Sequence, residues 1–494
     1  MPHRLFPFAC LAAALAMLAA CGPAEPEGPV EVVVIGQSET LFEEGIRLAP
    51  AAQALRAASA EGLVAFDSTG QIVPGLAERW IVTDDGASYI FRLRERNWPD
   101  GEPISAGDVR TSLNAALKQL EGSPLGLDLA KLTDVRAMTD RIVELRLSSP
   151  MPQFLRLLAQ PELGLRKDGV GAGPMIVERE EEQELAALTA MSPRERGLPE
   201  VEQRRKDEPD LALKAIEAQL AISAFSRGDV DLITNGQLAA FPQIELGPLS
   251  RGAVQVDPAL GLMGLRVMST EGVLADPARR EALSMALDRA ALIEPFGLGG
   301  WQPTSWIVPP AIFENEALPS GRWDTLSLEE RRGVASARMA RWREESGAEG
   351  IVITVGLPPG PGSDLLFRGL SQSWAALGVR AEKVLSGTGA QLEWTDRLAR
   401  YSSPRWFLNQ FNCDVADGPC SAEADDLVLT SIFIADPAQK EAALAQAHTI
   451  LVAEDVFIPL GAPVRWSLVR GAIDAFEPNP WGIHPLFPLA GPTT

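Results

Sequence analysis

The stretch that decides the fold is GLVAFDSTGQIVPGLAERWIVTDDGASYIFRLRERNWPDGEPISAGDV, which covers residues 62–109. Aromatic and apolar residues alternate with polar ones over positions 89–93, the pattern of a strand with one buried face. The Asp-Asp-Gly sequence at 84–86 has the composition of a tight turn. We therefore predict a β-hairpin over 78–94, followed by a helix whose N-cap is Ser105.

Downstream of this stretch, helical and strand patterns alternate. Asp276 followed by Pro277 predicts the N-cap and first position of a helix. Branched residues at 350–357 predict a buried strand, and a helix with an apolar stripe follows and ends at Gly378. A second strand is predicted at 379–385. Strand, helix and strand in this order form a parallel βαβ unit, so we predict an α/β protein.

Three further segments carry structural expectations. Residues 178–209 are highly charged, and we predict that they form a long solvated excursion or a mobile insertion. Asp436 and Pro437 repeat the helix-start pattern. The run VFIPLGAPVRWSLV, residues 456–469, is then expected to form a pair of strands.

The N-terminus has the features of an export signal. A short basic start is followed by an apolar run over 5–20, which is too short for an ordinary membrane span. The sequence Leu-Ala-Ala-Cys that ends at Cys21 resembles a bacterial lipobox, which implies cleavage before Cys21 and lipidation of this residue. The alternative is a plain signal peptide that contains a cysteine. Residues 1–20 are thus the expected signal peptide, and 21–30, rich in Pro, Gly and Glu, the expected tether.

Length and charge narrow the possible architectures and partners. A chain of 494 residues exceeds what one compact core usually supports, so at least two lobes are expected. The formal net charge of -22 argues against nucleic acid as a partner, because phosphates demand a basic surface. The same charge weakly favours basic or zwitterionic ligands.

Cysteines and histidines are too few for most metal and redox chemistry. Two of the four cysteines lie in the export signal, and the other two are Cys413 and Cys420. An exported protein matures where disulfides persist, so this pair is expected to bond. Their spacing is not that of a redox Cys-x-x-Cys motif, and the acidic residues around them do not follow the calcium-loop pattern. We therefore predict no metal, no cofactor and no catalytic residue.

The residues of the opening stretch resemble the signature region of family 5 extracellular solute-binding proteins, the dipeptide- and oligopeptide-binding proteins of ABC transporters. The resemblance covers about residues 31–490 and includes the segments GAGPMIV, FSRGDVDLI and RREALSMALDRAALI. Within the signature region the matching residues are Gly62, Leu63, Pro74, Leu76, Ala77, Trp80, Asp85, Gly86, Tyr89, Phe91, Leu93, Arg94, Trp98, Asp100, Gly101, Pro103, Ala106, Asp108 and Val109.

The resemblance implies a two-lobed periplasmic-binding-protein fold of the Venus-flytrap type, with an additional domain that extends the first lobe. Lobe I would comprise 31–61, 161–265 and 466–494, the additional domain 62–160, and lobe II 266–465. It also implies a protein without enzymatic activity that captures a small, peptide-like solute and delivers it to an ABC permease and its ATPase. We expect it on the periplasmic side of a bacterial membrane, held there only by its lipid.

The resemblance also suggests ligand-binding residues. Peptide-binding members hold the ligand's ammonium on an Asp, and in this chain Asp414 takes that place, with Asp417 as a second candidate. The segment that follows is shorter than in the family, and Asp425 is expected to cap a helix. Loop aromatic residues and one arginine, a candidate for a ligand carboxylate, complete the expected ligand-binding set: Trp301, Trp306, Trp406 and Arg405.

Other functions fit the same sequence. The ligand could be a sugar, an opine or a metal chelate, because all occur in this family. The protein could also be a sensory or structural lipoprotein that has the same fold but no partner transporter. The enzymatic alternative is a hydrolase that uses an acidic cleft.

Overall fold

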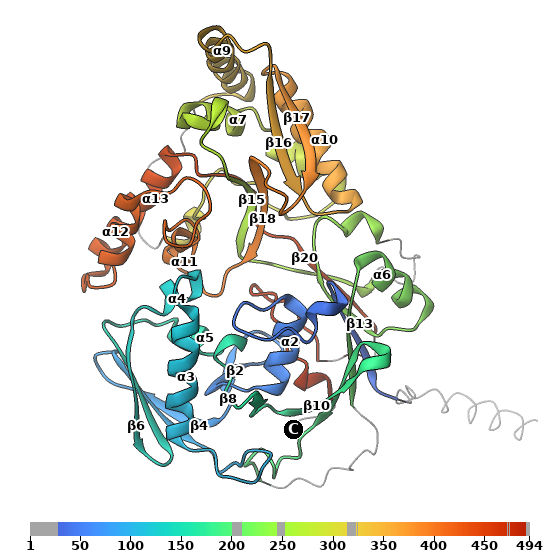
Figure 1. The fold of residues 1–494 in the computed structure, drawn as a ribbon, viewed down its shortest axis with the longest axis vertical. Coiled ribbons are helices and arrows are strands. Elements are labelled where there is room, and N and C mark those ends of the chain that lie inside the picture. The colour runs from blue at the N-terminus through green and yellow to red at the C-terminus, as the bar shows by residue number, and fades with distance from the viewer. Residues whose placement is uncertain are drawn as a thin grey trace, which may run out of the picture.

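Two β-sheets, each built from strands that are far apart in the sequence, form two lobes, with a third, smaller domain beside one of them (Figure 1). The structure, a computed structural model, describes residues 28–199, 210–244, 252–313, 323, 325–471, 473 and 475–490. The predicted signal peptide, tether and lipidation site, Cys21, therefore lie outside the described residues. The two-lobed fold with an additional domain is confirmed.

Lobe I is built on a mixed seven-stranded sheet. The strand β1 lies parallel to both β12 and β13, and β20 lies antiparallel to both β13 and β14. Buried apolar residues of β1, β12 and the helix α2 pack together beside the sheet. In sheet order the strands are β10 (Met175–Glu180), β11 (Leu185–Ala190), β12 (Leu211–Ile216), β1 (Val30–Ile35), β13 (Leu232–Gly236), β20 (Arg465–Val469) and β14 (Val254–Asp257), and the helices are α2 (Pro50–Ser59) and α6 (Ala218–Arg227).

Lobe II contains a five-stranded sheet and the predicted βαβ unit. The two strands of that unit, β16 and β17, are parallel and are joined by the helix α10, whose Trp374 is fully buried. In sheet order the strands are β17 (Val379–Leu385), β16 (Ile351–Leu357), β18 (Leu392–Leu398), β15 (Gly261–Val267) and β19 (Phe457–Gly461). The helices are α7 (Pro277–Met285), α8 (Arg289–Ile293), α9 (Leu328–Ser346), α10 (Pro361–Ala375), α11 (Pro404–Asn409), α12 (Ala422–Thr430) and α13 (Pro437–Ala453).

The additional domain contains the predicted hairpin and the capped helix. The hairpin strands β4 and β5 pair antiparallel, and Ser105 forms a reciprocal capping box with Asp108 at the start of α3. Its sheet runs in the order β4 (Ala77–Val82), β5 (Ser88–Leu93), β7 (Ile142–Leu147) and β6 (Leu132–Thr139), and its helices are α3 (Ala106–Leu120), α4 (Pro124–Leu129) and α5 (Phe154–Leu158). Two small two-stranded sheets lie nearby: β2 (Val64–Phe66) with β3 (Ile72–Pro74), and β8 (Arg166–Lys167) with β9 (Val170–Gly171).

Two connections join the lobes, and one of them corrects a prediction. The chain leaves lobe I between β14 and β15, at residues 258–260, and returns between β19 and β20, at residues 462–464. The two strands predicted within 456–469 exist, but they do not pair with each other, because β19 belongs to the sheet of lobe II and β20 to that of lobe I. The short Ala-Pro link that resembles a hairpin turn is therefore a crossing between lobes.

The prediction of a solvated excursion at 178–209 is wrong for its first part. Strands β10 and β11 form an antiparallel hairpin at the edge of the lobe I sheet, and β11 pairs with β12. Residues 185–188 are buried, because a short apolar run is enough to fill one strand between two others. The charged residues of this first part lie in the turn, where Glu181, Glu182 and Glu184 are exposed, and along the outer strand β10. Residues 200–209 lie outside the described part of the chain.

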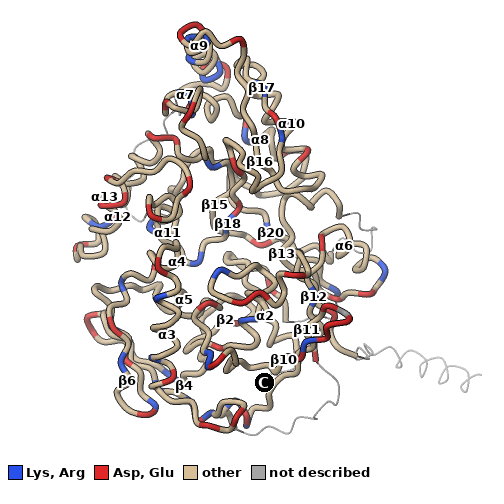
Figure 2. Tube along the Cα trace, viewed as in Figure 1, with Lys and Arg blue, Asp and Glu red and all other residues tan. Residues whose placement is uncertain are grey.

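Charged residues of both signs are spread along the described chain. Figure 2 shows Lys and Arg interspersed with Asp and Glu along both lobes and the additional domain. In the described part of the chain, no helix is long and apolar enough to cross a membrane.

Candidate functional site

A cavity of about 2050 Å³ lies between the lobes and takes its walls from both lobes and from the additional domain. Lobe I contributes the start of α2, the 3-10 turn η2 (Pro161–Leu163) and the segment after β20, and the additional domain contributes α4. Lobe II contributes the end of β18, α11 and the loop that follows it. A solute in this cavity would therefore contact residues of both lobes at the same time.

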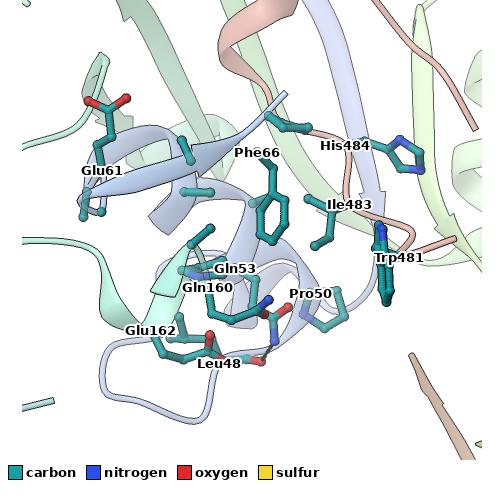
Figure 3. A pocket seen from close by; sticks show the side chains of 18 of the residues that line it. Leu48, Pro50, Gln53, Glu61, Phe66, Gln160, Glu162, Trp481, Ile483 and His484 are labelled. Atoms are coloured by element: carbon teal, nitrogen blue, oxygen red, sulfur yellow. Dashed lines mark hydrogen bonds between the residues drawn. The ribbon is translucent and has the colours of Figure 1, made fainter. Parts of the chain in front are cut away.

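Figure 3 shows a part of the cavity where apolar side chains lie beside polar ones. The apolar side chains are Leu48, Pro50, Phe66, Trp481 and Ile483, and the polar ones include Gln53, Gln160 and Glu162. The indole of Trp481 is held in place because the guanidinium carbon of Arg156 lies 4.1 Å from its ring centroid. Such a surface suits the apolar or aromatic part of a solute.

The lobes are joined inside the cavity by a charged cluster. Arg400, just after β18 in lobe II, donates from Nη2 to Oε1 of Glu162 at 2.6 Å and from Nη1 to Oε2 at 3.0 Å. Its Nη1 also donates to Gln160 Oε1 at 2.7 Å. Burial alone would raise the pKa of Glu162, but the charge and hydrogen bonds of Arg400 outweigh it and hold the pKa below its ordinary value. This bidentate ion pair connects lobe II to η2.

A buried carboxyl group lies beside that ion pair. Asp128, at the end of α4, is fully buried and accepts hydrogen bonds at Oδ1 from the Tyr401 hydroxyl at 2.9 Å and from Asn409 Nδ2 at 2.7 Å. No described residue donates to its second oxygen, Oδ2. Burial raises the pKa of Asp128 to about 7, although Arg405 opposes the shift. The interface between α4 and lobe II thus contains a carboxyl group that titrates near neutral pH.

A second ion pair fixes the wall near the lobe crossing. Arg465, the first residue of β20, donates from Nη1 to Oδ1 of Asp396 at 2.7 Å, and both side chains are almost completely buried. Burial raises the pKa of Asp396, and Arg465 opposes that shift. Two of the arginines that line the cavity are therefore neutralised by carboxylates of the protein itself.

Two of the six predicted ligand-binding residues line the cavity. Asp417 is exposed in the loop after α11, and Trp406 belongs to α11 and is buried with part of its side chain at the cavity wall. No described residue donates a hydrogen bond to the Asp417 carboxylate. These two residues are brought to the same lobe II wall by α11 and the loop that follows it.

The other four residues lie outside the cavity lining. Asp414 is exposed to solvent outside it. Arg405 is buried and donates to the carbonyl oxygens of Leu127 and Asp128, so it ties α11 to α4. Trp301 packs at the lobe crossing, where its Nε1 donates to Ala462 O at 2.9 Å. Trp306 stacks on His448 with ring centroids 5.4 Å apart.

The loop that carries Asp417 is closed by a disulfide between Cys413 and Cys420. The backbone at Gly418, with φ at +121°, passes so close to β15 that an added Cβ would lie 2.3 Å from Val267 O. Asp425 does not cap α12 as predicted, because the N-cap is Ser421. The Asp425 carboxylate instead accepts from the backbone N–H of Cys413 at 2.9 Å and so supports the start of the loop.

The disulfide is expected to be formed quantitatively in the exported protein. A free-thiol assay on the denatured mature protein should detect neither Cys413 nor Cys420 before reduction and both afterwards. Replacing both by serine should lower the free energy of unfolding, measured in urea, by about 2 kcal/mol, because the closed loop is short. An unchanged stability together with free thiols in the wild type would contradict the prediction.

Sequence reasoning missed several residues of the site. Trp481 lies in the sequence Asn-Pro-Trp-Gly and fits the same criterion, a loop tryptophan beside Gly and Pro, that selected Trp301 and Trp306. Phe66 precedes a turn in the opening stretch, where the pattern gave no reason to single it out. Arg400 and Glu162 are far apart in the sequence, and no local signal predicts that they pair.

In the part of the chain that the structure describes, no group of three or more His, Cys, Asp or Glu side chains could hold a metal ion.

The family model described as bacterial extracellular solute-binding proteins, family 5 middle, matches residues 71–382. Di/tripeptide-binding protein 1 of Pseudomonas aeruginosa (strain UCBPP-PA14) is 22% identical over 490 residues, which cover 87% of this chain and 88% of that protein. The probable deoxycholate-binding periplasmic protein YgiS of Escherichia coli (strain K12) is 36% identical over 121 residues, or 21% of this chain and 23% of that protein.

Among solved structures, Haemophilus influenzae OppA in complex with RPPGFSPFR superimposes with a TM-score of 0.78 at 18% identity. The match covers 93% of this chain and 98% of that one. The similarity therefore extends over both lobes and the additional domain.

Proposed function

Because the chain belongs to the family 5 bacterial extracellular solute-binding proteins, we propose that it is the substrate-binding component of an ABC importer. It captures a small, peptide-like solute between its lobes and presents it to the permease and ATPase of the transporter. The observation that carries the proposal is the cavity with walls from both lobes. The di/tripeptide-binding relative and the peptide complex of OppA support a peptide-like solute.

The lobe arrangement explains how binding would be signalled. Only two short connections, 258–260 and 462–464, join the lobes, so rotation about them can open and close the cavity. A solute that contacts both lobes binds the closed form better and shifts the population toward it. The protein binds the solute without changing it chemically, and it acts on the periplasmic side of the membrane, anchored through lipid on Cys21.

The carboxylate of Asp417 gives the solute a specific contact. Asp417 lies on the cavity wall, and no described residue donates a hydrogen bond to its carboxylate, which is suited to bind an ammonium group. Trp406 lies on the same wall, and the apolar side chains of Trp481 and Phe66 would hold the remainder of the solute.

The proposal is tested by identifying the solute and by replacing Asp417. Mass spectrometry of molecules released from natively purified protein should find small amine-containing compounds of peptide type. Asp417→Asn should weaken binding of a dipeptide mixture by about tenfold or more in isothermal titration, because a charge-assisted contact is lost.

Asp414→Asn is the matched control, since it removes an equal charge three residues away, outside the cavity lining. N-acetylated dipeptides should bind wild type and Asp417→Asn equally. If only non-amine solutes are released, or if Asp417→Asn retains full affinity, the ammonium contact is wrong.

A further inference from the structure

The contact between the additional domain and lobe II encloses one carboxyl group, that of Asp128 at the end of α4. Its side chain is fully buried. Both hydrogen bonds to its Oδ1 come from lobe II, from the Tyr401 hydroxyl at 2.9 Å and from Asn409 Nδ2 at 2.7 Å. Its Oδ2 has no donor among the described residues. Ionisation is costly at this place, because no donor compensates the negative charge at the second oxygen.

The groups that bury Asp128 lie on the two sides of the lobe connections. The additional domain is on the lobe I side of both connections, 258–260 and 462–464, whereas α11 belongs to lobe II and packs against α4 (Figure 1). Arg405 of α11 also donates to the carbonyl oxygens of Leu127 and Asp128. Rotation about the two connections therefore separates α4 from α11 and admits water to the Asp128 carboxyl group.

The charged groups that face Asp128 reduce the cost of ionisation without removing it. Arg405 comes from α11, and Arg400 comes from the segment after β18 and is itself paired with Glu162. Burial raises the pKa of Asp128 to about 7, although Arg405 and Arg400 oppose the shift. Burial also raises the pKa of Tyr401 well above its ordinary value, so its hydroxyl remains a donor to Asp128 at neutral pH.

We propose that protonation of Asp128 controls the opening of the cavity: a bound proton holds α4 against lobe II, and loss of the proton favours separation of the lobes. In the open form water solvates the carboxylate, so the group ionises at its ordinary cost. The closed form therefore binds the proton more tightly, and by linkage the proton favours the closed form. The solute and the proton then stabilise the same form. A rise in pH eases release of the solute, whatever its chemical class.

One other group in this contact acts in the opposite direction at higher pH. Lys131, just after α4, donates from Nζ to Pro150 O at 3.1 Å. Burial lowers its pKa to about 8, and the charges of Lys440 and Arg405 lower it further. Below pH 7.5 Lys131 is mostly charged in both forms, so its effect hardly changes there. Above pH 8 its deprotonation favours the closed form, so the effect of Asp128 is best separated between pH 5.5 and pH 7.5.

The test measures the lobe arrangement by small-angle X-ray scattering of the purified protein, dialysed to remove solute, at pH 5.5 and pH 7.5. The radius of gyration of the wild type should increase with pH, because the ratio of open to closed molecules rises by about tenfold or more. Asp128→Asn has no proton to lose and should keep the smaller radius at both pH values. The chain has two tyrosines, Tyr89 and Tyr401, so NMR of 13C-labelled tyrosine should show the Tyr401 signal titrating near pH 7 only in the wild type.

Asp134→Asn, at a more exposed site on β6, is the matched control and should expand as the wild type does. Burial also raises the pKa of Asp396, but all three proteins contain this group, so it does not contribute to the difference between them. A radius of gyration that is the same at both pH values in the wild type, or that increases equally in Asp128→Asn, overturns the inference. Neither outcome affects the proposed function, which is tested by binding of the solute and not by its pH dependence.

Discussion

Replacing Glu162 by glutamine is expected to lower the free energy of unfolding in urea by about 3 kcal/mol, because it leaves the Arg400 charge without its buried partner. The Glu162 side chain is only 2% exposed and that of Arg400 26%, so solvent cannot fully replace the lost contact. The same change should increase the radius of gyration measured by small-angle X-ray scattering, because the ion pair links lobe II to η2.

The pH dependence of this effect has a defined direction. Because the pKa of Glu162 is below its ordinary value, the ion pair contributes its full stability above that ordinary value, near 4.5. The contribution is lost as the pH falls through the lowered pKa. The difference between wild type and Glu162→Gln should therefore be constant at neutral pH and disappear in acid.

Glu102→Gln provides the control for this experiment. Glu102 pairs with Lys167 at 2.7 Å, but its side chain is 69% exposed, so its removal should change stability by less than about 0.5 kcal/mol. Equal effects of the two substitutions would show that the Glu162–Arg400 pair does not hold the lobes together.

Asp128→Asn is expected to stabilise the protein at pH 8 by roughly 2–4 kcal/mol, because an ionised carboxylate no longer has to be buried. The pKa of Asp128 is raised from 3.8 to about 7, so the folded protein binds a proton that the unfolded chain releases. In the wild type, the stabilisation that comes from this bound proton is fully present below pH 4 and is lost as the pH rises through 7. The variant should lack this dependence.

Urea unfolding of both proteins between pH 4 and pH 8 measures the difference directly. The quantity to compare is the difference in unfolding free energy between the two proteins at each pH. Burial also raises the pKa of Glu61 and Asp396, and because both proteins contain these groups, their contribution cancels in the difference. Asp134→Asn, at a more exposed site on β6, should show the wild-type dependence. A wild type and Asp128→Asn with parallel pH profiles would contradict a buried carboxyl that titrates near neutral pH.

Much of the fold could be predicted because local signals agree with the final structure. The turn at 84–86, the cap at Ser105 and the βαβ unit depend on neighbours in the sequence, and each appears as expected. The errors concern pairing over long distances. Nothing local distinguishes the link at 462–464 from a hairpin turn, and nothing local shows that 185–188 lies between two other strands.

The site was harder to predict than the fold, because side-chain direction is set by tertiary packing. Arg397 and Arg405 are eight positions apart in one segment, but the first lies on strand β18 at the cavity and the second lies on a helix that packs against α4. Asp414 and Asp417 differ in the same way, since only the loop backbone decides which of them reaches the cavity. A search for residue types therefore finds the correct segment and not the correct residue.

The position of β20 in the lobe I sheet has a consequence for how the protein matures. This strand lies between β13 and β14 and is formed by residues 465–469, more than two hundred positions after both of its neighbours. The order of synthesis thus completes the sequence of lobe II before lobe I has all of its strands. A chain truncated before residue 465 would expose the edges of β13 and β14 to aggregation, so proteolytic loss of the C-terminus should inactivate the whole protein.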